Sequence, residues 1–446
     1  MMLRSTLAFA LASSAWLAGC DPNIRIGSLS EAGAPASHVP EQLPAHMMIG
    51  LAADDGTWMG ASGIAWDVRW TYFTSSPGTG TGWYNGWVSG ALGTDWAVGW
   101  LQGAASQNFI PGVQYYLLEP DYEPSGNAGA QILSAKLQVP SVMKDYFGKW
   151  KLFLQAAKQV PRPVLVILEG NALGAIEVQA NNDPTTYAAI ADSGLPELAG
   201  LPNTVAGFGL AFLALRQAVG ASNVVLGPDV EPNAAQGDFL NHAASDDIAP
   251  HVDYQYGGFF SHFGLAPNQT GATFDLVATC PSYADADQYA AQGDAGFWWD
   301  ASDSAAVSTP SFNRYAEWLT RFNQASKLPW ILWQVPMGNS NSPNVDNQEG
   351  AWAGPYSSGY VLPAGCTQKS TTGCPGGYKD NRAEYFLGEE HAPHLAKFTA
   401  AGTIGILFGA NAAASDQVDD YYTDGQLFMK SRAGALIAAG GFSLAR

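Results

Sequence analysis

Short runs of apolar and β-branched residues recur along the chain, and most are followed by a polar loop and then by a longer segment. Such runs, bounded by turn residues, are typical of buried strands. Eight are predicted as strands, at residues 64–73, 113–118, 164–168, 224–227, 251–256, 274–279, 330–335 and 402–408. Strands that alternate with helices indicate an α/β protein with a parallel sheet.

Four of the longer segments have apolar residues at the three- and four-residue spacing of an amphipathic helix. They are residues 143–159, 204–219, 311–326 and 382–401. Asn203 is the expected N-cap of the second helix, which should end at Gly220. Eight strands with interposed helices favour a (β/α)₈ TIM barrel. The alternative is an open doubly wound sheet, but no glycine-rich phosphate loop follows the first strand.

The amino-terminal segment, residues 1–20, has a different pattern. Arg4 precedes an apolar run over residues 7–17, which is too short to span a bilayer as a stable anchor. The run ends in Leu-Ala-Gly-Cys20, which resembles the lipobox of bacterial lipoproteins. The resemblance implies a signal peptide over residues 1–20 and acylation of Cys20, as by palmitate. The protein would then be exported and anchored by lipid to a bacterial membrane, on the periplasmic side or at the cell surface. The alternative is an ordinary secretory signal.

Residues 21–45 lack periodicity and are rich in Pro, Ser, Ala and Gly, so they are predicted to form a flexible tether. Residues 46–446 are predicted to form one large barrel domain. No later run of about 18 apolar residues occurs, so the lipid would be the only attachment to a membrane.

Composition narrows the ligands that such a barrel could bind. The chain has 446 residues with 20 basic and 39 acidic side chains, a net charge of −19. That charge repels the phosphates of nucleic acids, so no nucleic-acid partner is expected. The chain also has 15 Trp, 18 Tyr and 20 Phe. Aromatic side chains need burial or ligands, so this content excludes a disordered chain. We expect a monomer that handles neutral ligands.

Four cysteines are present, and export favours disulfides. Cys366 and Cys374 flank a short polar loop and are predicted to form a disulfide. Cys280 would then be an odd thiol, partly buried beside a strand end.

Carboxylates follow several of the predicted strands. In a barrel, catalytic residues lie where strands end, and hydrolysis of a glycosidic bond needs two carboxyl groups, one protonated and one ionised. The candidate catalytic residues are Glu169, Asp229, Glu231, Asp285 and Asp287. The structural alternatives are a salt bridge or loop cap for Glu169, capping of the turn that holds Asp229 and Glu231, and an N-cap of a helix at residues 287–292 for Asp285 and Asp287.

Aromatic and amide side chains near the same strand ends are the candidate substrate-binding residues, since sugars stack on aromatic rings. They are Trp83, Trp87, Trp298, Trp299, Trp333, Gln334, Asn339 and Arg382. For any single Trp, packing in the core is the alternative.

Two parts of the chain resemble known proteins. The run PVLVILEGNALG at residues 163–174 looks like the third-strand region of secreted bacterial sugar-hydrolase-like barrels, where family-6 cellulases carry a Glu-Pro-Asp. Here Gly170 and Asn171 replace the Pro and Asp. The runs FDLVATCPSYADAD, PWILWQVPMGN, KDNRAEYFLGE and AAGTIGILFGAN resemble a group of secreted bacterial proteins often joined to cellulose-binding modules. The resemblance implies a barrel fold, a polysaccharide context, and a ligand-side or structural role for Arg382.

Other chemistries lack their motifs. The seven His include no H-E-x-x-H, and no G-x-S-x-G is present, so neither a metal site nor a serine nucleophile is predicted. No cofactor is expected. The sequence therefore favours a glycoside hydrolase that acts on a neutral polysaccharide of the β-glucan type. The alternative is a non-catalytic, surface-anchored glycan-binding lipoprotein.

Overall fold

The structure, a computed structural model, describes residues 38–53, 57–74, 93–118, 127–232, 247–266, 272–281, 299, 311–335, 381–409 and 428–444. Eight parallel strands form one sheet in the order β5-β4-β3-β2-β1-β8-β7-β6. The strands are β1 (Met48–Ala52), β2 (Val68–Thr74), β3 (Ile110–Tyr116), β4 (Val164–Leu168), β5 (Val224–Pro228), β6 (Val277–Thr279), β7 (Trp330–Val335) and β8 (Thr403–Phe408).

The sheet closes into a barrel. The first and last strands, β1 and β8, pair with each other in parallel. Between β5 and β6, an isolated parallel bridge joins Asp229 to Ala278, and the Val230 N–H donates to the Ala278 carbonyl at 2.8 Å. Eight parallel strands with helices between them form a (β/α)₈ TIM barrel, as predicted.

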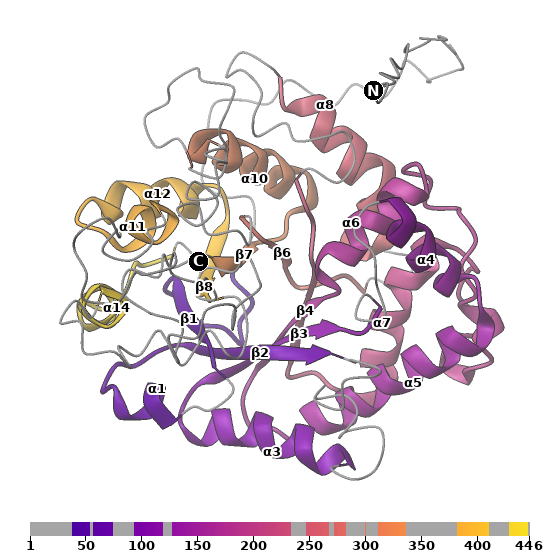
Figure 1. Ribbon diagram of the computed structural model, residues 1–446, viewed down its shortest axis with the longest axis horizontal. Coiled ribbons are helices and arrows are strands. Elements are labelled where there is room, and N and C mark those ends of the chain that lie inside the picture. Colours follow the sequence, from indigo (N-terminus) through magenta and orange to yellow (C-terminus); the bar gives the residue numbers. More distant parts are fainter. Residues whose placement is uncertain are drawn as a thin grey trace, which may run out of the picture. The chain divides into compact units, whose positions relative to one another are not determined.

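Helices surround the strands (Figure 1). They are α1 (Thr57–Ala61), α3 (Gly93–Ser106), α4 (Asn127–Leu137), α5 (Pro140–Ala157), α6 (Gly170–Gln179), α7 (Val205–Val219), α8 (Ala249–Val252), α10 (Phe312–Ser326), α11 (Asn381–Leu387), α12 (His391–Ala400) and α14 (Phe428–Ala438), with two short 3₁₀ turns, η1 (Ala191–Ser193) and η2 (Pro196–Leu198), and a π-helix, η4 (Asp253–Leu265).

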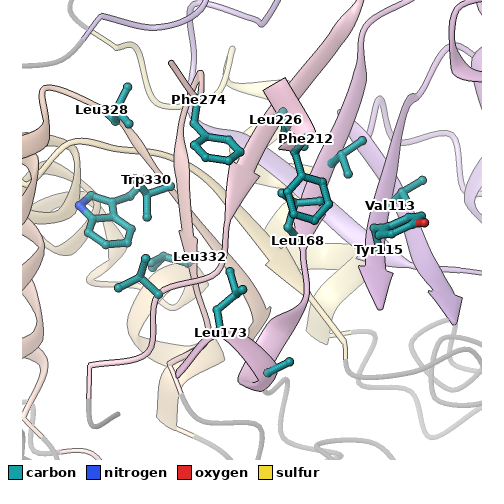
Figure 2. Close-up of a cluster of buried hydrophobic side chains, with 14 of the residues drawn as sticks. Val113, Tyr115, Leu168, Leu173, Phe212, Leu226, Phe274, Leu328, Trp330 and Leu332 are labelled. Carbon is teal, nitrogen blue, oxygen red and sulfur yellow. The ribbon is translucent and has the colours of Figure 1, made fainter. Parts of the chain in front are cut away.

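Two hydrophobic clusters follow from the alternation of side chains along each strand. One set of positions faces the helices, where Val113 and Tyr115 of β3 and Leu168 of β4 pack with Phe212 of α7 (Figure 2). The other set faces the inside of the barrel, where Trp70 and Trp333 are the largest side chains. A Cβ at Gly112 would lie 2.6 Å from the Cβ of Trp70, so the neighbouring glycine leaves room for the indole.

Three of the predicted helices match single helices closely. Residues 143–159, 204–219 and 311–326 correspond to α5, α7 and α10. The N-cap of α7 is Thr204 rather than Asn203, because the Thr204 hydroxyl accepts from the Gly207 N–H at 3.2 Å. The helix ends at Gly220, as predicted.

The prediction for residues 382–401 holds less well. That segment forms two helices, α11 and α12, which are separated by residues 388–390.

The predicted strand at residues 251–256 is wrong. This segment is α8 followed by the π-helix η4, whose Phe259, Phe260 and Phe263 are buried. Six residues of alternating pattern are too few to separate a strand from a helix. The strand β1 was missed because its five residues come soon after a Pro-rich segment, with no polar loop between them that would mark the start of a strand. The count of eight strands was right because these two errors cancel.

Candidate active site

Four aromatic side chains gather at the carboxyl end of the barrel. Trp70 and Tyr72 lie two residues apart on β2, and their ring centroids are 5.3 Å apart. Tyr72 also packs edge-on against Trp333 of β7 at 6.3 Å and against Tyr116 of β3 at 6.4 Å. Strand ends in a barrel form the face at which catalytic residues gather. We call these four side chains the aromatic cup.

Asp229 joins this cup from the end of β5. Its side chain is fully buried. The Trp333 Nε1–H donates to Asp229 Oδ1 at 2.5 Å, which links β7 to the end of β5. A carboxylate held by an indole N–H has a fixed orientation, which a catalytic carboxylate requires.

Glu231 follows Asp229 by two residues and is half-buried. Burial raises the pKa of the Tyr315 hydroxyl well above its usual value, and the charges of Cys280, Glu231 and Asp229 raise it further. Both carboxylates therefore lie within electrostatic reach of one hydroxyl group. The structure thus places Asp229 and Glu231 two residues apart after the end of β5, the first fully buried and the second half-buried.

Gln334 bridges two strands across the barrel mouth. Its Nε2 donates to the Tyr72 hydroxyl at 2.7 Å, and the buried Cys280 thiol donates to its Oε1 at 3.4 Å. The backbone of Gln334 has φ 54°, in the left-handed region that non-glycine residues rarely adopt. Strained residues of this kind cluster at functional sites. The role of Gln334 in ligand binding stays a prediction.

Glu169 occupies a different environment from the other candidates. Its side chain is fully buried, and its Oε1 accepts from the Leu117 N–H at 3.0 Å and from the Tyr146 hydroxyl at 2.5 Å. Its Oε2 accepts from the Leu118 N–H at 3.1 Å. Because Tyr146 is on α5, this carboxylate faces the helix layer. Glu169 therefore stabilises the end of β3 against α5.

The backbone explains why Glu169 faces the helices. Strand alternation would place residue 169 on the same side as Leu165 and Ile167, which face the inside of the barrel. Glu169 instead adopts φ 57° and ψ 20°, which ends the strand and turns the side chain toward α5. The next residue, Gly170, then lies beside the aromatic cup, near Tyr116 and Trp333.

Trp299 and Arg382 lie behind the end of β6. The Trp299 ring is buried against Phe312 and Tyr315, with centroids 5.1 Å away in each case. The fully buried Arg382 guanidinium lies over the Trp299 ring and donates to the Pro281 carbonyl at 2.8 Å. These contacts fit the structural alternative for both residues, since they hold the end of β6 against α10.

The remaining predicted residues lie outside the described part of the chain. They are Trp83, Trp87, Asp285, Asp287, Trp298 and Asn339, together with Cys20 and the Cys366–Cys374 pair. Their roles stay predictions. Within the described ranges, Cys280 is buried, and its thiol forms the hydrogen bond to Gln334.

Sequence reasoning missed Tyr72, Tyr116 and Gln114. The two-residue spacing of large and polar side chains along the strands could have identified them. Tyr72 follows Trp70 by two residues on β2, and Tyr116 follows Gln114 by two residues on β3. Such pairs face the same side of a strand.

No metal or membrane-spanning feature is found in the described segments. No three His, Cys, Asp or Glu side chains there are grouped closely enough to hold a metal ion. Nor does any helix in these segments combine the length and apolar character needed to cross a bilayer.

Comparisons with known proteins give distant structural matches alone. No family model and no curated protein matches the chain. Among solved structures, a GH26 β-mannanase from Bacteroides ovatus is 10% identical with a TM-score of 0.39, over 85% of this chain and 89% of that one. A GH26 endo-β-1,4-mannanase from Cellulomonas fimi is 9% identical with a TM-score of 0.43, over 85% and 71%.

A GH5-4 endoglucanase from an uncultured bacterium is 10% identical with a TM-score of 0.39, over 88% of this chain and 85% of that one. The assignment of this chain's site rests on its own residues.

Proposed function

We propose that the chain is a glycoside hydrolase that acts on a neutral polysaccharide of the β-glucan type, with Asp229 and Glu231 as its carboxylate pair. The observation that carries the proposal is the buried Asp229 carboxylate, which the Trp333 N–H of the aromatic cup holds just after the end of β5, with the half-buried Glu231 two residues further along the chain. Residues two apart on an extended chain have Cα atoms roughly 6.6 Å apart. Glycosidases use carboxyl separations of about 5–5.5 Å for retention and about 6.5–9.5 Å for inversion.

The two carboxylates have different environments, as the reaction requires. Glu231 is half-buried, so it can exchange a proton with solvent and protonate the glycosidic oxygen as the bond breaks. Asp229 is oriented by the Trp333 N–H, so its carboxylate has a fixed position from which it can stabilise the positive charge that develops on the sugar ring. A water molecule then adds to the sugar and gives a proton to Glu231, which restores the acid.

The aromatic cup supports a sugar as the substrate. Aromatic faces suit the C–H surface of a pyranose, and the half-buried Tyr72 and Tyr116 offer a ring and a hydroxyl each. The net charge of −19 disfavours anionic polymers, so a neutral polysaccharide is the better match.

The test is release of reducing ends from a panel of neutral polysaccharides by the full chain. Glu231→Gln and Asp229→Asn should each lower kcat by roughly 10²–10⁴. Glu317→Gln, which removes an exposed carboxylate of α10 that pairs with Arg321, should leave kcat unchanged. Glu169→Gln distinguishes Glu169 from the proposed pair, Asp229 and Glu231, because the main effect of this variant should be on stability. Full activity in Glu231→Gln would refute the assigned pair.

The end of β7 favours a second function, which is non-catalytic binding of a glycan. Gln334 is a neutral amide held by Tyr72 and Cys280, so this strand end carries no carboxylate at that position. Under this alternative, the chain would be retained on a polysaccharide without releasing reducing ends. The same panel, run as a pull-down, distinguishes binding from hydrolysis.

We also propose that the protein is exported and anchored to a bacterial membrane through lipid on Cys20. The support is the sequence Leu-Ala-Gly-Cys20 after a short apolar run. Two or more acyl chains give stable anchoring, with about 0.8 kcal/mol per buried CH₂. Radiolabelled palmitate should enter the wild-type chain, and Cys20→Ser should abolish the label and release the protein from the membrane fraction.

A further inference from the structure

Gln114 is a buried polar side chain that the proposed mechanism leaves unexplained. It lies on β3 and is fully buried. Neither its Oε1 nor its Nε2 has a hydrogen-bond partner among the residues that the structure describes. A buried polar group without a partner costs about 1–3 kcal/mol, so proteins usually satisfy such groups with water or a ligand.

The carboxamide of Gln114 is beside the aromatic cup. Its neighbours on β3, Val113 and Tyr115, pack in the outer cluster, so Gln114 faces the inside of the barrel. A Cβ built on Gly170 would lie 3.1 Å from Gln114 Nε2 and 3.6 Å from the rings of Trp333 and Tyr116. Because Gly170 has no Cβ, its backbone can lie close to the Gln114 amide and to both rings.

We propose that the Gln114 carboxamide binds a hydroxyl group of the sugar, which makes it a specificity-determining residue of the proposed hydrolase. The inference rests on the proposed function, because it needs a sugar in the aromatic cup. A sugar hydroxyl both donates and accepts, so one hydroxyl or two adjacent ones match the Nε2–H donors and the Oε1 acceptor of the amide.

Access to Gln114 requires a movement of a side chain. No part of Gln114 is exposed, whereas Tyr116 is half-buried and lies on the same side of β3. For a sugar to reach the amide, the inference requires the Tyr116 ring to rotate about its side-chain bonds. Ring movements of this kind at a partly exposed position are fast compared with turnover.

The test compares Gln114→Met with the wild type in the full chain, with Gln159→Met as the matched control. Gln159 is exposed and lies beyond the end of α5, away from the barrel mouth. Two properties are measured, the melting temperature of the unliganded protein and the Kd for cellohexaose and mannohexaose. Both measurements use a Glu231→Gln background, so that the sugars are not hydrolysed.

Gln114→Met should weaken binding of the preferred hexaose at least tenfold, which equals about 1.4 kcal/mol. The melting temperature should stay the same or rise, because the variant removes two unpartnered polar atoms. The control should change neither value. A structural role, such as holding an internal water, predicts a lower melting temperature with unchanged Kd, and that result would overturn the inference.

A second variant covers the case in which Gln114→Met does not fold. Gln114→Glu keeps the shape of the side chain but removes the N–H donors, and it should also weaken binding. If neither variant folds, Gln114 is structural and the inference is wrong. If the wild type neither binds nor hydrolyses any neutral polysaccharide, the proposed function itself fails. Unchanged binding by the variants, with an active wild type, overturns only the role of Gln114.

Discussion

The indole nitrogen of Trp333 lies 2.5 Å from Oδ1 of Asp229, although the two residues are 104 positions apart in the chain. This hydrogen bond connects the seventh strand to the end of the fifth. It also joins an aromatic side chain that could contact a sugar to a carboxylate that could stabilise charge. Activity should therefore depend on the N–H group as well as on the carboxylate.

Trp333→Phe should lower kcat by roughly ten- to a hundredfold, since a hydrogen bond to a charged group is worth about 1.5–3 kcal/mol. KM should change less, because a ring remains in the cup. Trp330→Phe is the matched control on the same strand, where the indole N–H donates to the Leu319 carbonyl in the outer layer. Steady-state kinetics on the best polysaccharide check this, and equal losses in the two variants would contradict it.

Tyr146→Phe should destabilise the fold by about 1–3 kcal/mol, because it removes the hydroxyl that donates to the buried Glu169 carboxylate. Burial and the charge of Glu169 raise the pKa of the Tyr146 hydroxyl, so it stays a donor through neutral pH. Urea unfolding gives the free-energy change. The control is Tyr187→Phe, an exposed tyrosine whose hydroxyl donates to Asp192, and it should cost much less.

Stability should fall as pH rises from about 4.5 to about 8 through Glu177 of α6. Burial raises the pKa of this carboxyl from 4.5 to about 8. In that range the folded state holds a proton that the unfolded chain loses, so the free energy of unfolding decreases by about 1.4 kcal/mol per pH unit from this group. Below about 4.5 the contribution is constant.

Glu177→Gln should remove that component, because an amide does not titrate. The variant should gain stability over the wild type as pH rises from 5 to 8. Urea unfolding at several pH values measures the difference between the two proteins. A constant difference across the range would show that Glu177 ionises normally in the folded chain.

Two glycines in helices should respond to alanine in opposite directions. A Cβ at Gly209 of α7 would lie 2.1 Å from the Phe263 carbonyl oxygen, so Gly209→Ala should separate α7 from η4 and cost about 1–3 kcal/mol. A Cβ at Gly148 of α5 would meet no atom within 4 Å. Gly148→Ala should therefore stabilise the protein by roughly 0.5–1 kcal/mol, as read from melting temperatures.

Much of the barrel could be predicted because strands and helices leave local patterns. The helix α10 is an example, since its apolar positions and its Ser311 N-cap are both local features. The weakest predictions concerned short segments. Residues 251–256 alternate like a strand, but burial of Phe259, Phe260 and Phe263 against neighbouring helices decides that the segment is helical.

The candidate site was predicted in part. The sequence shows that Asp229 and Glu231 follow a strand. It does not show that both carboxylates lie within electrostatic reach of the Tyr315 hydroxyl. Glu169 also follows a strand, yet its carboxylate faces the helix layer. The difference arises because Glu169 adopts a left-handed backbone conformation, which no propensity of glutamate indicates.

The sequence by itself therefore determined the alternation of strands and helices, the barrel class and the strand ends at which polar residues gather. Only the tertiary structure decided which of those residues face the barrel mouth. The direction of a side chain at a strand end depends on one pair of backbone angles and on partners far along the chain. Trp333 supplies that partner for Asp229, and Tyr146 supplies it for Glu169.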